Sequence, residues 1–172
     1  MRKIFGKLIF SFSIIIAPFI LNSCLNTNEE PGRTEADEQE ELNNAIANVI
    51  KNGYDVDTTN LGSYYIVNKT GTGEFPQSGD TVKLIYTGFF LDGSVFDSSI
   101  NQNNPDSLYE LIFLKTPLIT GFNEAISMMN KGADIDFIMP SKLAYGSTGI
   151  YEIKPYTPLG FNIKMRYIGK VR

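Results

Sequence analysis

Residues 79–99 read GDTVKLIYTGFFLDGSVFDSS and decide the fold of this chain. Every second residue from 82 to 90 falls on one face of an extended chain, which is the period of a β-strand. Asp92-Gly93 follows as a hairpin-type turn, since glycine readily adopts the positive φ that such a turn requires. Residues 95–97 favour a short second strand. The stretch therefore predicts two antiparallel strands joined by a tight turn.

Further segments on either side of this hairpin show the same period of two. Strands are predicted over residues 64–69, 108–114, 133–139 and 159–167. Residues 121–130 instead have apolar side chains at helical spacing, and Lys131-Gly132 ends that helix. Several strands with one short helix before the last two predict an α+β fold, in which the helix covers one face of an antiparallel sheet.

A second helix is predicted ahead of this domain, over residues 35–51. Its apolar residues recur at the spacing of one helical face, and Asn52-Gly53 ends the pattern. They are Leu42, Ala45, Ile46, Val49 and Ile50. An amphipathic helix of this kind packs on the domain or extends a linker, and binding of a partner is the remaining alternative.

The composition excludes several classes of function. The 172 residues carry a net charge of −4, with no basic run beyond the N-terminus, so nucleic acid is not an expected partner. The chain has no histidine and a single cysteine, Cys24, which excludes Ser/His and Cys/His catalysis, zinc sites built on these ligands and internal disulfides. Neither a metal nor a cofactor is expected. Any catalysis must use aromatic, hydroxyl, carboxylate and backbone groups.

The N-terminus has the pattern of an export signal. Arg2, Lys3 and Lys7 precede an apolar run of about 14 residues, which suits a signal peptide and is short for a membrane span. The run ends in LNSC at residues 21–24, which resembles the lipobox of bacterial lipoproteins, where the cysteine is acylated and becomes the first mature residue. An ordinary cleaved signal with Cys24 as a stray thiol and an uncleaved anchor helix are the alternatives.

Several separate motifs, in order and at compatible spacing, resemble the FKBP-type peptidyl-prolyl cis-trans isomerase family over about residues 62–171. They are GDTV, YTG and DGSVFDSS within residues 79–99, LITGFNEA at 118–125, KG at 131–132, AYG at 144–146 and PLGFNI at 158–163. The resemblance implies a twisted antiparallel sheet of about five strands wrapped over one short helix. It also implies the activity of a peptidyl-prolyl cis-trans isomerase.

The N-terminal patterns and the family resemblance together predict four parts of the chain. They are a lipoprotein signal peptide (1–23), a flexible tether (24–34), the N-terminal helix with a connector (35–61) and the isomerase domain (62–172). A protein of this kind would be held by lipid at a membrane of the bacterial cell envelope, on the periplasmic side or the cell surface. It would act as a monomer on exported, proline-containing polypeptides.

The family's pocket residues carry over position by position. The catalytic residues implied are Tyr86, Phe96, Asp97, Ile119, Tyr145 and Phe161, and the substrate-binding residues implied are Tyr109, Leu118 and Phe122. Phe122 stands where many members have tryptophan, and Tyr109 stands where phenylalanine is frequent. The loop over residues 100–108 is longer than in minimal members.

These residue types suit rotation about an X-Pro bond. The reaction has a barrier of roughly 18–20 kcal/mol and needs no nucleophile, because a dry apolar cleft favours the twisted amide over the planar one. By resemblance, the Ile119 N–H and the Tyr145 hydroxyl donate to substrate carbonyls. Asp97 either faces the carbonyl carbon of the rotating amide or orients Tyr86, and both roles stay open.

Other readings of the same residues also stay open. The phenylalanines could be plain core residues, Tyr145 a loop residue bonded to backbone, and Asp97 a turn cap. At the level of function, the first hypothesis is an isomerase that assists folding of exported proteins. The alternatives are an FKBP-like binding or assembly lipoprotein with little isomerase activity, and a general chaperone that uses exposed apolar surface.

Overall fold

The computed structural model describes residues 32–100 and 107–171, and in them two α-helices and one sheet follow the predicted order. The helices are α1 (Glu35–Lys51), α2 (Thr120–Ser127) and the short 3-10 helix η1 (Ser141–Leu143). The strands are β1 (Asp57–Thr58), β2 (Tyr64–Lys69), β3 (Thr81–Phe89), β4 (Val95–Ser98), β5 (Tyr109–Ile112), β6 (Asp134–Met139) and β7 (Leu159–Gly169). The predicted α+β class is confirmed.

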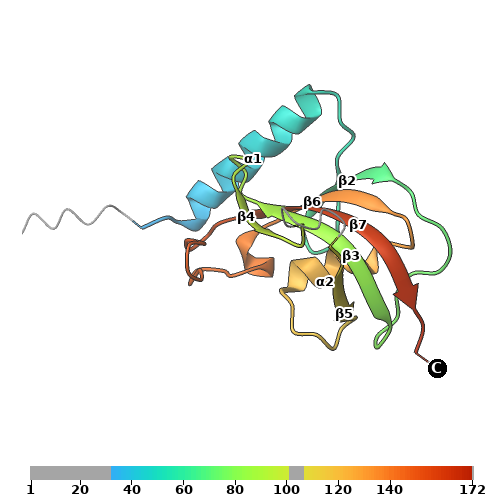
Figure 1. Ribbon diagram of the computed structural model, residues 1–172. Helices are drawn as coiled ribbons and strands as arrows, with labels where there is room; N and C mark the ends of the chain where they lie inside the picture. The colour runs from blue at the N-terminus through green and yellow to red at the C-terminus, as the bar shows by residue number, and fades with distance from the viewer. Residues whose placement is uncertain (1–31, 101–106, 172) are drawn as a thin grey trace, which may run out of the picture. The chain divides into compact units, whose positions relative to one another are not determined.

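The sheet is entirely antiparallel, with the order β1-β2-β6-β7-β3-β4. Among the described residues it has seven strands, where the family resemblance implies about five. One reason is β1, whose two residues are too few to show a period. The other is that β3 pairs with β7 along one edge and with both β5 and β4 along the other, so two short strands occupy one position (Figure 1).

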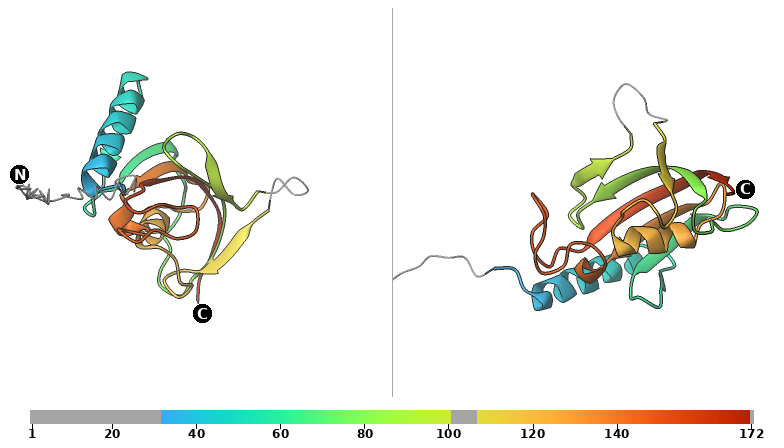
Figure 2. Two further views of the ribbon diagram at one scale, coloured as in Figure 1. Left: turned by 90° about the vertical axis from the view of Figure 1, so that its left-hand side faces the viewer. Right: turned by 90° about the horizontal axis from the view of Figure 1, so that it is seen from below.

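Helix α2 lies on the inner face of this sheet and forms the core with it (Figure 2). Phe122, Ala125 and Ile126 are buried, as the helical period predicts. Met129 is also buried but follows the helix, which ends at Ser127 and not at residue 130 as predicted. The alternate residues of the facing strands are buried against them, among them Val82, Leu84, Ile135, Phe137, Met139, Phe161 and Ile163. Gly121 allows close approach, because a Cβ there would lie 2.4 Å from the sulfur of Met139. This packing fixes the first turn of α2 over the sheet.

Helix α1 packs on the opposite, outer face of the sheet (Figure 1). A capping box starts it: Thr34 accepts from the Asp37 N–H, and the Asp37 carboxylate accepts from the Thr34 N–H. Further along the helix, Ile46 and Val49 face Ile138 and other outer-face residues of β2 and β6. The cavity between them is only about 20 Å³, so the helix lies close against the sheet. The sequence leaves open whether this helix packs on the domain, extends a linker or binds a partner, and in the structure it packs on the domain.

Some predictions fall outside the described residues. These are the signal peptide over 1–23, Cys24, most of the tether over 24–34, and residues 101–106 of the loop predicted to be long. In the described part of the chain, neither α-helix combines the length and the apolar character needed to span a membrane.

Candidate functional site

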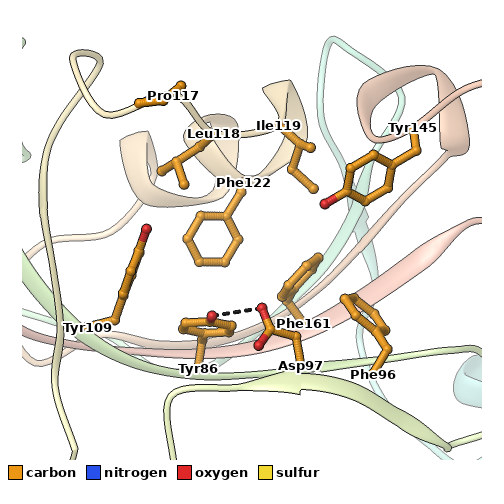
Figure 3. A pocket seen from close by; sticks show the side chains of 10 residues that line it. All are labelled: Tyr86, Phe96, Asp97, Tyr109, Pro117, Leu118, Ile119, Phe122, Tyr145 and Phe161. Atoms are coloured by element: carbon orange, nitrogen blue, oxygen red, sulfur yellow. Dashed lines mark hydrogen bonds between the residues drawn. The ribbon is translucent and has the colours of Figure 1, made fainter. Parts of the chain in front are cut away.

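A cavity of about 440 Å³ opens between the first turn of α2 and the inner face of the sheet (Figure 3). All nine residues predicted for the pocket line it, together with Pro117, which the sequence analysis missed. The lining residues are Tyr86, Phe96, Asp97, Tyr109, Pro117, Leu118, Ile119, Phe122, Tyr145 and Phe161. Pro117 directly precedes Leu118 and Ile119, which were both predicted to line the pocket, and this position in the chain could have indicated that Pro117 lines it too.

Neighbouring strands bring the sheet residues of the site together. Gly88 of β3 lies opposite Asp97 on β4 and opposite Phe161 on β7. A Cβ at Gly88 would lie 2.7 Å from Phe96 and 2.9 Å from Phe161. The glycine therefore leaves room for these two rings to meet over β3, with their centroids 5.6 Å apart and their planes at 89°. Such an edge-to-face contact is a favoured arrangement of aromatic rings.

Three aromatic rings form the base of the cavity. The centroid of Phe122 lies 5.1 Å from that of Phe161 and 5.4 Å from that of Tyr86, both in edge-to-face geometry. Tyr109 adds a further edge contact, 5.5 Å from Tyr86. Phe122 and Phe161 are buried members of the core as well as lining residues. The core reading and the pocket reading of these phenylalanines are therefore both true of the structure.

One hydrogen bond crosses the apolar wall of the cavity. The Tyr86 hydroxyl donates to Oδ2 of Asp97 at 2.8 Å. Burial, and after it the hydrogen bond to Asp97, raises the pKa of the Tyr86 hydroxyl well above its usual value. Tyr86 therefore stays neutral and keeps donating across the physiological range. The sequence leaves two roles open for Asp97, and this contact has the geometry that the second one requires, in which Asp97 orients Tyr86.

Two further polar groups border the opposite side of the cavity. Ile119 is the N-cap of α2, and its N–H donates to no other residue in the described ranges. Tyr145 follows η1, and its hydroxyl points into the cavity (Figure 3). A substrate carbonyl in the cavity could accept from either group. No three Cys, Asp or Glu side chains gather as metal ligands anywhere in residues 32–100 and 107–171.

Comparison with known proteins identifies the family. The family described as FKBP-type peptidyl-prolyl cis-trans isomerase matches residues 72–166. A relative from Aeromonas hydrophila, the FKBP-type peptidyl-prolyl cis-trans isomerase FkpA, is 38% identical over 124 residues, which are 72% of this chain and 44% of the relative. FkpA of Escherichia coli K12 is 34% identical over 64% of this chain and 39% of its own length. The chain thus spans less than half the length of these curated relatives.

Solved structures give the same result. A peptidyl-prolyl cis-trans isomerase from Pseudomonas syringae pv. tomato superposes with a TM-score of 0.67 at 27% identity, over 82% of this chain and 99% of that one. The crystal structure of FkpA from Escherichia coli gives 0.65 at 27% identity, over 80% of this chain and 63% of that one. Together with the match over residues 72–166, these similarities show that the chain belongs to the FKBP-type peptidyl-prolyl cis-trans isomerase family.

Proposed function

We propose that this protein is a peptidyl-prolyl cis-trans isomerase that rotates X-Pro bonds in polypeptides. The observation that carries the proposal is the aromatic cavity, in which nine residues implied by the family's pocket lie around one space of about 440 Å³. A proline ring fits such an apolar space, and no nucleophile, metal or cofactor is needed to turn an amide. The relatives named above carry the same activity in their names.

The cavity lowers the barrier by the environment it offers. The planar amide is stabilised by resonance and by water, and rotation of roughly 90° removes most of its charge separation. Transfer into the aromatic cleft strips water from the amide, which costs the planar form more than the twisted one. Phe96, Phe122 and Phe161 hold the proline ring while the residue before proline turns. Binding that is tighter for the twisted form than for the planar form increases the rate.

Polar groups at the rim hold the rest of the chain still. The Ile119 N–H and the Tyr145 hydroxyl donate to carbonyls on either side of the rotating bond. Asp97 accepts from the Tyr86 hydroxyl, which keeps both side chains in one orientation against the cleft. Each such hydrogen bond contributes about 1 kcal/mol, so loss of one lowers the rate several-fold without abolishing it.

A direct assay on the full chain tests this function. The cis-to-trans relaxation of an X-Pro-containing tetrapeptide anilide is followed by absorbance without an added protease. We expect a rate above the uncatalysed one, and a rate at least tenfold lower for Phe161→Ala because the base of the cleft is lost. Phe75→Ala is the matched control, since Phe75 is half exposed and lies outside the cavity.

The outcomes separate the alternative functions. If the folded parent gives no rate above background, the isomerase proposal fails and a binding or assembly role takes its place. If aggregation of an unfolded client is suppressed equally by the parent and by Phe161→Ala, while no isomerisation is seen, the general chaperone reading is favoured.

Placement at the cell envelope is part of the same proposal. The basic and apolar segment before LNSC supports export, and Cys24 supports acylation and a membrane anchor. Attachment by lipid would hold the isomerase, as a monomer, where exported clients emerge. Labelled palmitate should enter the parent and be lost in Cys24→Ala, whereas labelling that persists in the variant rules out the lipid anchor.

A further inference from the structure

Helix α1 reaches the part of the chain that carries Tyr145. This part, the Tyr145 loop, covers residues 140–158 between β6 and β7 and includes η1. Glu38 and Leu42 of α1 border one cavity with Ser141, Gly146 and other residues of the loop. The contact lies at the N-terminal half of α1, away from the aromatic cavity. It brings a segment outside the matched residues 72–166 against an element of the candidate site.

A buried carboxylate forms the centre of this contact. Glu38 is only 6% exposed, and Ser141 is 3% exposed. Oε2 of Glu38 accepts from the Ser141 hydroxyl at 2.6 Å, and Oε1 accepts from the Ser141 N–H. A carboxylate is expensive to bury unless it is hydrogen-bonded, and bonds to a charged acceptor are stronger than neutral ones. Both oxygens of Glu38 therefore hold Ser141 firmly.

Ser141 in turn fixes the backbone on both sides of Tyr145. Its carbonyl oxygen accepts from the Ala144 N–H and from the Gly146 N–H, each at 2.8 Å. Ala144 and Gly146 are the immediate chain neighbours of Tyr145. Two bonds to one carbonyl pin the peptide units that set the direction of the Tyr145 side chain. The route from Glu38 to Tyr145 thus passes through a single residue.

A second contact from the start of α1 reaches the same loop. Nε of Arg33 donates to the Tyr156 carbonyl at 2.7 Å, and the Tyr156 N–H donates to the Gly146 carbonyl at 2.9 Å. Arg33 itself is held by an ion pair with Glu41. The loop is therefore attached to the α1 segment at Ser141 and at Tyr156, on either side of Tyr145.

We propose that Glu38 is a positioning residue of the isomerase site, which holds the Tyr145 hydroxyl over the cavity by fixing Ser141. Helix α1 is then part of the catalytic unit and more than a connector. The inference rests on the proposed isomerase function for its kinetic effect, but the structural link from Glu38 to the loop does not depend on it. Loss of the carboxylate leaves the buried N–H and O–H of Ser141 without an acceptor, which favours a rearranged loop.

A double-substitution cycle on the full chain measures the link. We expect Glu38→Ala to lower kcat/KM about fivefold, the effect expected from losing the Tyr145 hydrogen bond in Tyr145→Phe. In the Tyr145→Phe background the same change should alter kcat/KM less than twofold, because the bond that Glu38 serves is already gone. Glu38→Gln keeps one acceptor oxygen and should recover part of the rate. A merely destabilising change would lower both backgrounds equally.

The second arm records the backbone amide signals of Ala144 and Gly146 by ¹H–¹⁵N NMR on the labelled full chain. Glu38→Ala should shift or broaden both signals, while Glu40→Ala, an exposed glutamate of the same helix, should leave them unchanged. Unshifted amides in Glu38→Ala, or equal rate losses in the two Tyr145 backgrounds, would overturn the inference. A parent without isomerase activity contradicts the proposed function instead, and the NMR arm then decides the link from Glu38 by itself.

Discussion

The two α-helices lie on opposite faces of one sheet and are held there by different means (Figure 1). Helix α2 places three apolar side chains in the core, those of Phe122, Ala125 and Ile126, and its first turn borders the aromatic cavity. Helix α1 has only two buried residues, Leu42 and the charged Glu38. The hydrophobic effect is roughly proportional to the apolar area buried, so α2 belongs to the cooperative core and α1 is a lightly attached element.

This difference separates the stability of the fold from the shaping of the site. The inner helix supplies stability and the base of the cavity together, so substitutions there affect both. The outer helix adds little burial, but its Glu38 and the preceding Arg33 hold the Tyr145 loop at two points. Substitutions in α1 should therefore change the loop with little change in the core.

The largest effect is expected in α2. Ile126 is fully buried, and Ile126→Ala leaves a cavity in the core, so the free energy of unfolding should fall by about 2–5 kcal/mol. Urea unfolding followed by circular dichroism measures this loss. Ile50→Ala in α1 is the matched control, because Ile50 is 56% exposed, and its effect should be small. Equal losses for the two isoleucines would remove the contrast between the helices.

A smaller loss is expected where α2 approaches β6. Gly121→Ala places a Cβ 2.4 Å from the sulfur of Met139, so the helix or the methionine must shift. Overpacking of this kind costs about 1–3 kcal/mol. Urea unfolding reports the loss, and Met139→Ala should relieve part of it in the double variant. Unchanged stability of Gly121→Ala would show that the helix does not need its close approach.

A local effect is expected in α1. Leu42 is 4% exposed, and Leu42→Ala removes most of the apolar contact that holds the helix against the Tyr145 loop. We expect a loss of roughly 1 kcal/mol in global stability, since the core can remain folded when α1 detaches. Amide hydrogen exchange should accelerate in α1 while the amides of β3 and β7 keep their protection. Faster exchange in β3 as well would place α1 within the cooperative core.

The inner region could be predicted from the sequence because its signals are periodic. Alternation along β3, β6 and β7 and helical spacing in α2 each mark a buried face, and the predicted bounds differ from the observed ones by few residues. The site depends on residues from distant segments, such as Tyr86 and Phe161. The period predicts that each of them lies on a buried face, but it does not predict that they line the same cavity. The family motifs were needed to bring them to one cavity.

The outer contact could not be predicted in the same way. Glu38 lies four residues before Leu42, so the helical period places it on the packed face of α1, whereas Glu40 falls on the opposite face. The period alone does not say which residue a buried glutamate would bind. Its partner Ser141 is 103 residues further along the chain. The pairing depends on how α1 lies across the folded sheet, which is decided only once both elements have formed. Polar contacts over such distances leave no periodic signal.

The smallest effect is expected at the polar pair on the inner face, and it depends on pH. Burial and the bond to Asp97 raise the pKa of Tyr86, so the folded protein holds this proton at a pH where the unfolded chain has lost it. The stability that results is fully present below about pH 10, the ordinary tyrosine pKa, and is lost as the pH rises toward the folded value.

Urea unfolding of the parent and of Tyr86→Phe between about pH 9 and pH 11 tests this expectation. Above about pH 10 the parent should lose stability with rising pH more steeply than the variant, because only the parent has this proton to lose. The tyrosinate absorbance of the folded parent should match that of the variant over the same range. An extra tyrosinate signal in the parent near pH 10 would show that Tyr86 ionises near the ordinary tyrosine pKa. The inner face of the sheet would then be open to water at Tyr86, as its outer face is, and the contrast between the two faces would not include this residue.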